Sequence, residues 1–173
     1  LIASLSLETD NLDHFKPFNQ KKVPLIFFDR VEEDNEANMS VVIDNFKAGF
    51  DATNHLVAQG CKRLVMVTSD LRRNVYKKRF QGFKSALAKN DLAFEECQLI
   101  LNDLSEEAAV KSANLILAMR PLPDGVFLTN DFTAAVCMNV FKENGIRVPE
   151  DIAIVGFNND PVSKLVNPGI TTI

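Results

Sequence analysis

Three short hydrophobic runs in the sequence each end in a cluster of small polar side chains. These clusters are Thr68-Ser69-Asp70, Thr129-Asn130-Asp131 and Asn158-Asn159-Asp160. In an open parallel α/β sheet, the carboxyl ends of the strands point into one crevice, and ligands bind there. Asn and Asp side chains that meet in such a crevice suit a ligand rich in hydroxyl or amide groups.

The segments between these clusters alternate between strand and helix patterns. Strands are predicted at 1–7, 24–28, 39–43, 64–67, 98–101, 126–128 and 152–157. Helices are predicted at 13–21, in the stretch that ends at Gly60, around Phe80–Leu87, from the N-cap Ser105 to the prolines at 121 and 123, and at 132–143. This β-α alternation predicts an α/β fold with a doubly wound, mostly parallel sheet covered by helices on both faces.

The predicted helix at 132–143 is apolar on nearly all sides. A helix of this kind must bury both faces, so one face is expected on the sheet and the other on a second helix or a second subunit. The sequence leaves both alternatives open. The residues assigned to a dimer interface are Ala134, Cys137, Met138, Phe141, Val162 and Leu165.

Composition excludes several classes of function for this segment. The 173 residues carry a net charge of -4, and no basic stripe indicates contact with nucleic acid. No apolar run approaches the roughly 18 residues of a membrane span. The acidic stretch 32–38 is predicted to be a solvated connection. The three cysteines have no metal-binding or redox spacing, which indicates reduced thiols and a cytoplasmic location.

No catalytic or cofactor-binding motif is present. The two histidines, His14 and His55, are isolated, and no glycine-rich phosphate loop or nucleophile motif occurs. We therefore expect a binding module, not an enzyme, with no cofactor and no metal.

Five motifs occur in the same order as in one bacterial family. The strongest is the run from Val148-Pro149-Glu150-Asp151 to Gly156-Phe157, closed by the segment 167–173. Further matches are Ala48-Gly49 with His55-Leu56 and Gly60, Arg79 to Phe83 (R-x-x-G-F), Asn130-Asp131, and Asp29-Arg30. Together they resemble the LacI/GalR family of bacterial transcription regulators over essentially the whole chain.

The resemblance implies a periplasmic-binding-protein-like core with two lobes and a hinge, incomplete in this chain. Residues 1–38 would be a remnant of the N-terminal lobe, 39–160 the C-terminal lobe, and 161–173 a crossover segment toward the N-terminal lobe. The family's DNA-binding helix-turn-helix would lie outside these residues. One departure is Asn158-Asn159, where the family often has two aspartates, and an amide donates as well as accepts hydrogen bonds.

The resemblance also implies a set of effector-binding residues, each with a structural alternative. Arg79 would hold two ligand oxygens with its planar fork, or be a surface arginine. Asn130 and Asp131 would both contact the ligand, or the roles would be split, with Asn130 binding and Asp131 capping the next helix. The structural alternative for Asn130 is to be the cap itself. Asn158 would bind or shape a turn, and Asp29 would bind or pair with Arg30. Phe157 could stack on a ligand ring, and Ser69 and Asn74 are weaker loop candidates.

The expected function is the ligand-binding and dimerisation core of a LacI-type DNA-binding transcriptional regulator. A small polar effector, such as a sugar, would bind between the lobes of a homodimer, and operator DNA would be contacted only through the missing N-terminal domain. The alternatives are a periplasmic-type solute-binding protein for sugar uptake and a Rossmann-type enzyme. The latter is disfavoured because the chain has no phosphate-binding glycine loop.

Overall fold

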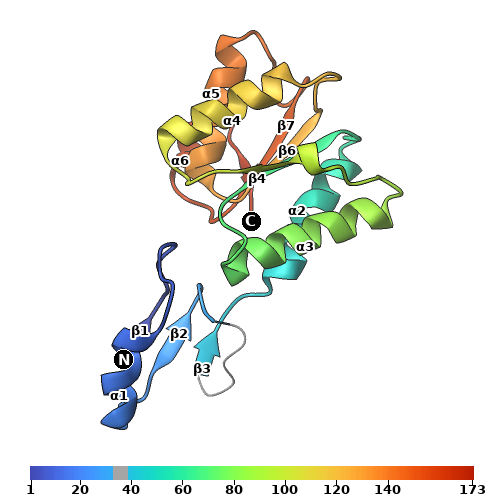
Figure 1. Ribbon diagram of the computed structural model, residues 1–173. Helices are drawn as coiled ribbons and strands as arrows, with labels where there is room; N and C mark the ends of the chain where they lie inside the picture. Colours follow the sequence, from blue (N-terminus) through green and yellow to red (C-terminus); the bar gives the residue numbers. More distant parts are fainter. Residues whose placement is uncertain (33–38) are drawn as a thin grey trace.

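The computed structural model describes residues 1–32 and 39–173, and it contains two separate parallel sheets (Figure 1). Most of the predicted acidic connection therefore lies outside the described residues. In the described part, no helix is long and apolar enough to cross a membrane.

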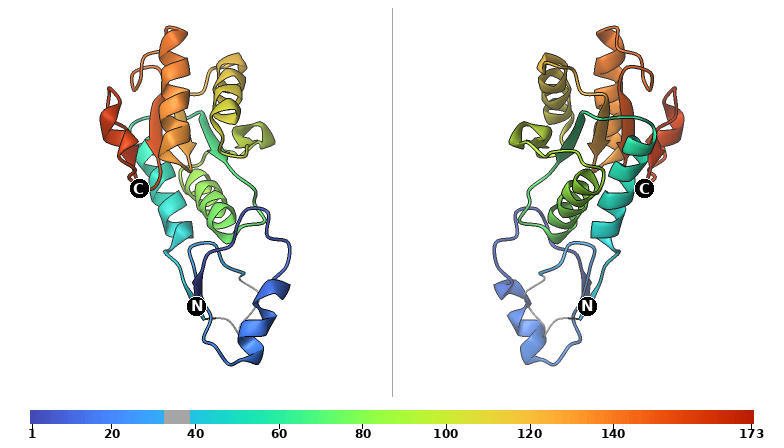
Figure 2. Two further views of the ribbon diagram at one scale, coloured as in Figure 1. Left: turned by 90° about the vertical axis from the view of Figure 1, so that its left-hand side faces the viewer. Right: turned by 90° about the vertical axis from the view of Figure 1, so that its right-hand side faces the viewer.

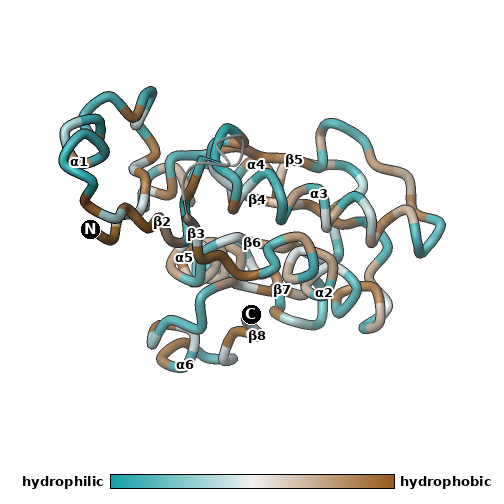
Figure 3. Tube along the Cα trace, turned by 90° about the horizontal axis from the view of Figure 1, so that it is seen from below, coloured by the Kyte–Doolittle hydropathy of each residue, from teal (hydrophilic) through white to brown (hydrophobic). Residues whose placement is uncertain are grey.

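The first lobe is a small three-stranded sheet in the order β1-β2-β3, with all pairs parallel. Its elements are β1 (Ile2–Ala3), the 3-10 turn η1 (Asp13–Phe15), α1 (Lys16–Gln20), β2 (Ile26–Phe28) and β3 (Met39–Val41). Leu5, Leu25, Phe27 and Val31 form its core. Figure 3 shows hydrophobic chain along β2 and β3. Because β3 pairs with β2, the predicted lobe boundary between 38 and 39 was wrong, and the second lobe begins after residue 41.

The second lobe is built on a five-stranded parallel sheet in the order β5-β4-β6-β7-β8. Its elements are α2 (Asn45–Ala58), β4 (Leu64–Thr68), α3 (Asn74–Lys89), η2 (Glu96–Gln98), β5 (Leu99–Leu101), α4 (Glu106–Ala118), β6 (Gly125–Leu128), α5 (Asp131–Glu143), β7 (Ala153–Gly156), α6 (Val162–Leu165) and β8 (Thr171–Thr172). The segment 161–173 supplies α6 and the edge strand β8 to this lobe, so its assignment as a crossover segment is corrected.

Alternating side chains of the central strands pack into two hydrophobic cores, one on each face of the sheet. Val65 and Val67 of β4 face the core shared with α4 and α5, whereas Leu64 and Met66 face the core shared with α2 and α3. Successive strand residues point to opposite faces, so a strand covered on both sides is apolar throughout. The two views in Figure 2 show one helix pair on each side of the sheet. The predicted doubly wound α/β fold is confirmed.

The helix ends follow the local sequence. The Asp44 carboxylate accepts from Lys47 N at 2.8 Å, and the Ser105 hydroxyl accepts from Ala108 N at 3.2 Å. Such N-caps satisfy backbone donors that have no partner within the helix. Gly60 follows α2 with a φ of 95°, as expected of a glycine that ends a helix.

The apolar helix α5 buries most of its apolar side chains inside the chain, although Phe132 near its start is 44% exposed. Ala134, Cys137, Met138 and Phe141 are at most 3% exposed and belong to the core shared with α4. The thiol of Cys137 donates to Ala109 O at 3.4 Å. Helix α4 therefore covers the face that the sequence analysis assigned to a second subunit. The assignment of these four residues to a dimer interface is corrected, because they belong to the core of the chain. Val162 is partly buried, and Leu165 is 82% exposed on α6.

Candidate functional site

A cavity of about 480 Å³ lies where the two lobes face each other. Residues of the first lobe and of its connection to α2 line one side, and residues of the second lobe line the other. The lining residues are Phe28, Asp29, Val41, Val42, Ile43, Arg79, Phe157, Asn158 and Ile173. Four residues predicted as effector contacts, Arg79, Asp29, Phe157 and Asn158, are thus brought to one cavity.

Arg79 is held in place by three neighbours of the second lobe. Its Nε donates to Asn45 Oδ1 at 2.9 Å, and its Nη1 donates to Thr129 O at 3.3 Å. The guanidinium carbon lies 3.5 Å from the centroid of the Phe157 ring, a cation–π contact. Arg79 also lines the cavity.

The charge of Arg79 is retained despite its burial. The residue is 5% exposed, and burial lowers its pKa to about 10, while Tyr76 and Asp29 act in the opposite direction. A group with that pKa is protonated at neutral pH. The surface-arginine alternative is therefore wrong, and Arg79 presents a buried cation to the cavity.

Asp29 and Asn158 stand on tightly turned backbone at the ends of β2 and β7. Their φ angles are 57° and 99°, in a region that Asp and Asn enter more readily than most other side chains. Asn158 N donates to Ile173 O at 2.9 Å, and Asp29 N donates to Val41 O at 3.1 Å. Both backbones are thus anchored beside the cavity, and both side chains are exposed.

Asn130 has the capping role that was its alternative, and Asp131 neither caps α5 nor lines the cavity. The Asn130 side chain caps α5 by accepting from Thr133 N at 3.0 Å. Asp131 is fully buried, and its Oδ2 accepts from Asp160 N at 2.7 Å, which ties α5 to the loop that follows β7. Burial raises the pKa of Asp131, against the hydrogen bonds from Thr172 and Asp160. Neither residue is among those that line the cavity.

Ser69 also lies away from the cavity lining. It is 2% exposed at the end of β4, next to Thr68, whose hydroxyl accepts from that of Thr129 at 3.1 Å. Burial at the sheet end explains why a residue that follows a strand need not face a ligand.

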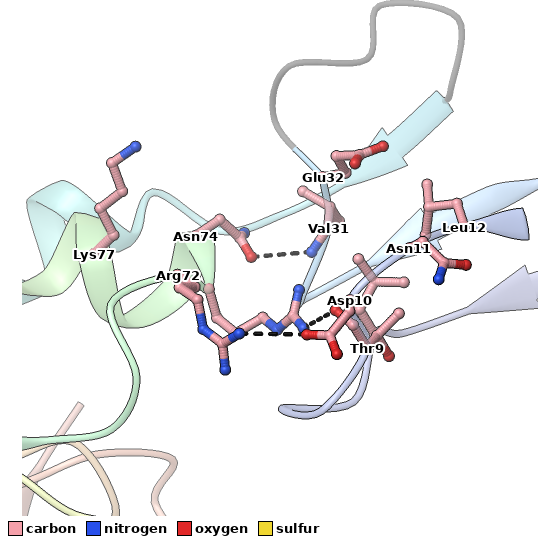
Figure 4. Close-up of a pocket in the computed structure, with 11 residues that line it drawn as sticks. Thr9, Asp10, Asn11, Leu12, Val31, Glu32, Arg72, Asn74 and Lys77 are labelled. Atoms are coloured by element: carbon pink, nitrogen blue, oxygen red, sulfur yellow. Dashed lines mark hydrogen bonds and ion pairs between the residues drawn. The ribbon is translucent and has the colours of Figure 1, made fainter.

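A second pocket, of about 230 Å³, lies at another contact between the lobes (Figure 4). Arg72, Arg73 and Asn74 of the second lobe face Asp10 and Val31 of the first there. Sequence reasoning treated Asn74 as a minor candidate and did not single out Arg73 or Asn45. In the sequence, each of these residues is only a polar side chain near the start of a helix. That pattern does not reveal which residue of the other lobe it contacts.

Metal binding finds no support in the described ranges. Across residues 1–32 and 39–173, no group of three or more His, Cys, Asp or Glu side chains could hold a metal ion.

Comparisons with known proteins give one consistent result. A family model described as a periplasmic binding protein-like domain matches residues 53–173. The transcriptional repressor PurR of Pasteurella multocida is 30% identical over 173 residues, which cover all of this chain and 51% of that protein. PurR of Actinobacillus pleuropneumoniae serotype 3 is 28% identical over 93% of this chain and 48% of its own length. The chain spans about half the length of these curated relatives.

Solved structures agree with this result. The transcriptional regulator CelR, in a complex with cellobiose, is 26% identical with a TM-score of 0.84, over 92% of this chain and 50% of that one. A LacI regulator from Bacillus cereus subsp. cytotoxis has a TM-score of 0.88 at 21% identity, over 99% of this chain and 60% of that one, and shows the shared fold. The chain therefore belongs to the periplasmic binding protein-like domain family, and over this domain it is similar to LacI-type transcriptional regulators.

Proposed function

We propose that the chain binds a small polar effector between its lobes and thereby controls a DNA-binding transcriptional regulator. The observation that carries this proposal is the interlobe cavity, into which Arg79 and Asn158 of one lobe and Asp29 of the other all reach. A ligand that touches both walls stabilises one spacing of the lobes.

The lining of the cavity favours a ring-shaped polar ligand such as a sugar. Arg79 donates hydrogen bonds, Asp29 accepts them, and Asn158 does both. Phe28 is 46% exposed and offers apolar surface on which a ring can lie, whereas Phe157 is 3% exposed and one face of its ring is covered by Arg79. The complex of CelR with cellobiose supports this class of ligand.

Regulation follows from the difference in affinity between two lobe arrangements. A ligand can shift the equilibrium between arrangements only by the ratio of its affinities for them. Because the coupling is reciprocal, an effector that weakens operator binding is itself bound more weakly when the protein sits on the operator.

The remaining parts of the proposal concern the whole protein. We assign DNA contact to a domain outside these residues, homodimerisation to the second lobe, and the location to the cytoplasm. The relatives are transcriptional repressors, which supports a regulator without catalytic activity.

The experiment is a thermal-shift screen of the intact protein against sugars, sugar phosphates and nucleobases. A ligand at about 100 times its Kd raises the stability by roughly 2.7 kcal/mol, which is readily detected. We expect Arg79→Ala to abolish the shift, because it removes the guanidinium fork from the cavity, and Arg79→Lys to weaken it.

The matched control is Arg120→Ala, which removes an exposed arginine at the end of α4 and should keep the full shift. Far-UV circular dichroism verifies that each variant is folded. An Arg79→Ala protein that binds the hit with wild-type affinity would remove Arg79 from the site.

A further inference from the structure

The first residue of α3 joins the two lobes through its side chain. Asn74 is 5% exposed, and both ends of its amide are used. Its Nδ2 donates to Asp29 O at 2.9 Å, and its Oδ1 accepts from Val31 N at 2.9 Å. Figure 4 shows Asn74 reaching across to Val31. The amide thus pairs with the first lobe's backbone as a neighbouring strand would.

The two partners of Asn74 are tied by hydrogen bonds and packing to the sheet of the first lobe. Asp29 follows β2 directly and is bonded to Val41 of β3, while Leu5 N donates to Arg30 O at 3.0 Å. Val31 is 7% exposed in the core of that lobe. A side chain that holds these backbone groups therefore holds the whole carboxyl edge of the first sheet.

On the second-lobe side of the contact, Asn74 lies on a helix that is packed in place. Asn74 begins the 16-residue helix α3, and the next two residues, Val75 and Tyr76, are buried in turn. Farther along α3, Gly82 packs against the backbone of α2. Asn74 thus connects two bodies that each have a hydrophobic core of their own.

Neighbouring contacts between the lobes hold other segments of the first lobe. Arg72 pairs with Asp10 at 3.3 Å, but both side chains are largely exposed, and such pairs contribute little. Arg73 Nη2 donates to Leu7 O at 3.1 Å and also to Thr9 O, in the loop that follows β1. Asn74 instead holds the segment that carries Asp29, a residue that lines the interlobe cavity.

We propose that Asn74 is an amide clasp that holds the lobes at their observed spacing and positions the Asp29 wall of the cavity. Separation of the lobes must break both bonds of the clasp. Because an unpaired buried polar group is costly, the clasp resists partial opening. The inference concerns the spacing of the lobes and is independent of the ligand's identity.

The test measures the distance between the lobes in the intact protein without ligand. Nitroxide labels are placed at Lys21→Cys in the first lobe and Ala88→Cys at the end of α3, with the exposed Cys97 replaced by Ser. Asn74→Asp keeps the shape and the acceptor but loses the donor and sets a carboxylate against the Asp29 carbonyl.

We expect a single short-distance population in the parent protein and a second, longer one in Asn74→Asp. The ratio of closed to open molecules should fall about tenfold, the effect of one lost hydrogen bond with its unpaired partner. The matched control is Asn114→Asp, the same change at an exposed position of α4, which should leave the distances unchanged.

Asn74→Ala removes both bonds without adding charge and should open the lobes in the same way. Distances equal to those of the parent in both folded variants would overturn the clasp. If neither variant folds, Asn74 is required for the fold of the chain itself, and the inference is likewise overturned. Loss of ligand binding with unchanged distances would count against the clasp and leave the proposed function standing.

Discussion

Individual residues of the recognised motifs perform distinct tasks in the structure. Arg79 of the R-x-x-G-F motif reaches the cavity, whereas Asp151 of the V-P-x-D motif closes the turn before β7. Asp151 Oδ2 accepts from Arg147 N at 2.8 Å and from Arg147 Nε at 2.9 Å, and its Oδ1 accepts from Nη2. The motif is thus partly a structural signature, and only some of its residues can contact a ligand.

The pH dependence of Asp151 follows from these bonds. Side-chain and backbone hydrogen bonds from Arg147 hold the pKa of Asp151 at about 2, below its ordinary 3.8. A carboxyl with a lowered folded-state pKa stabilises the fold above its unfolded pKa, and that stabilisation is lost as the pH falls from 3.8 through 2.

We expect Arg147→Gln to raise the pKa of Asp151 part of the way toward 3.8. The rise is not complete because the backbone N–H of residue 147 still donates to the carboxylate. NMR titration of the carboxyl carbon measures this shift. Asp103 serves as an internal control, because its pKa is lowered chiefly by its hydrogen bonds with Ser105 and should not change. An Asp151 midpoint unaffected by the substitution would show that Arg147 does not hold the carboxylate in solution.

At the scale of elements, two glycines set the spacing of α2 and α3. A Cβ at Gly49 would lie 2.2 Å from Arg79 O, and a Cβ at Gly82 would lie 2.2 Å from Phe46 O. The helices can approach this closely only where neither carries a side chain. This close approach places Arg79 beside Asn45. The two glycines, which belong to two of the recognised motifs, therefore help to position a residue that lines the cavity.

Gly82→Ala should therefore lower the free energy of unfolding by about 2 kcal/mol or more, since the clash is with backbone and not with a flexible side chain. Denaturant unfolding monitored by circular dichroism gives the value. Gly169→Ala is the matched control, because its Cβ would meet Ser163 O at an ordinary 3.4 Å. Equal stability losses in the two variants would contradict the packing argument.

The helices of the second lobe were predicted more accurately than the strands of the first lobe. The stripe Gly49, Ala52, Thr53 and Leu56 is buried in α2 as its periodicity indicated, and Ser105 caps α4. The strand predicted over 1–7 is ordered as β only at Ile2–Ala3. Helix patterns report local hydrogen bonds, whereas the extent of a strand depends on neighbours that its own residues do not encode.

At the scale of the whole molecule, the buried face of α5 is not available to a second subunit. Met138 is 3% exposed, so Met138→Glu would place a carboxylate in the core and destabilise the fold instead of separating subunits. Leu165 remains available, since it is 82% exposed on α6.

If α6 takes part in the proposed homodimer, Leu165→Glu should reduce a dimeric mass to a monomeric one, because the apolar contact would receive a charge. Light scattering coupled to size-exclusion chromatography measures the mass. Leu115→Glu on α4, also an exposed leucine, is the control that should remain dimeric. A dimer that survives Leu165→Glu would exclude α6 from the contact.

The sequence by itself determined the α/β class, the family and four residues of the cavity, because these depend on hydrophobic periodicity and on motifs read along the chain. Tertiary structure alone decided which polar residues are available to a ligand. Asn130 is used by a helix cap, Asp131 is buried under the loop after β7, and Asn74 is committed to the other lobe. A polar side chain has a fixed capacity for hydrogen bonds, and only its neighbours in space determine where that capacity is used.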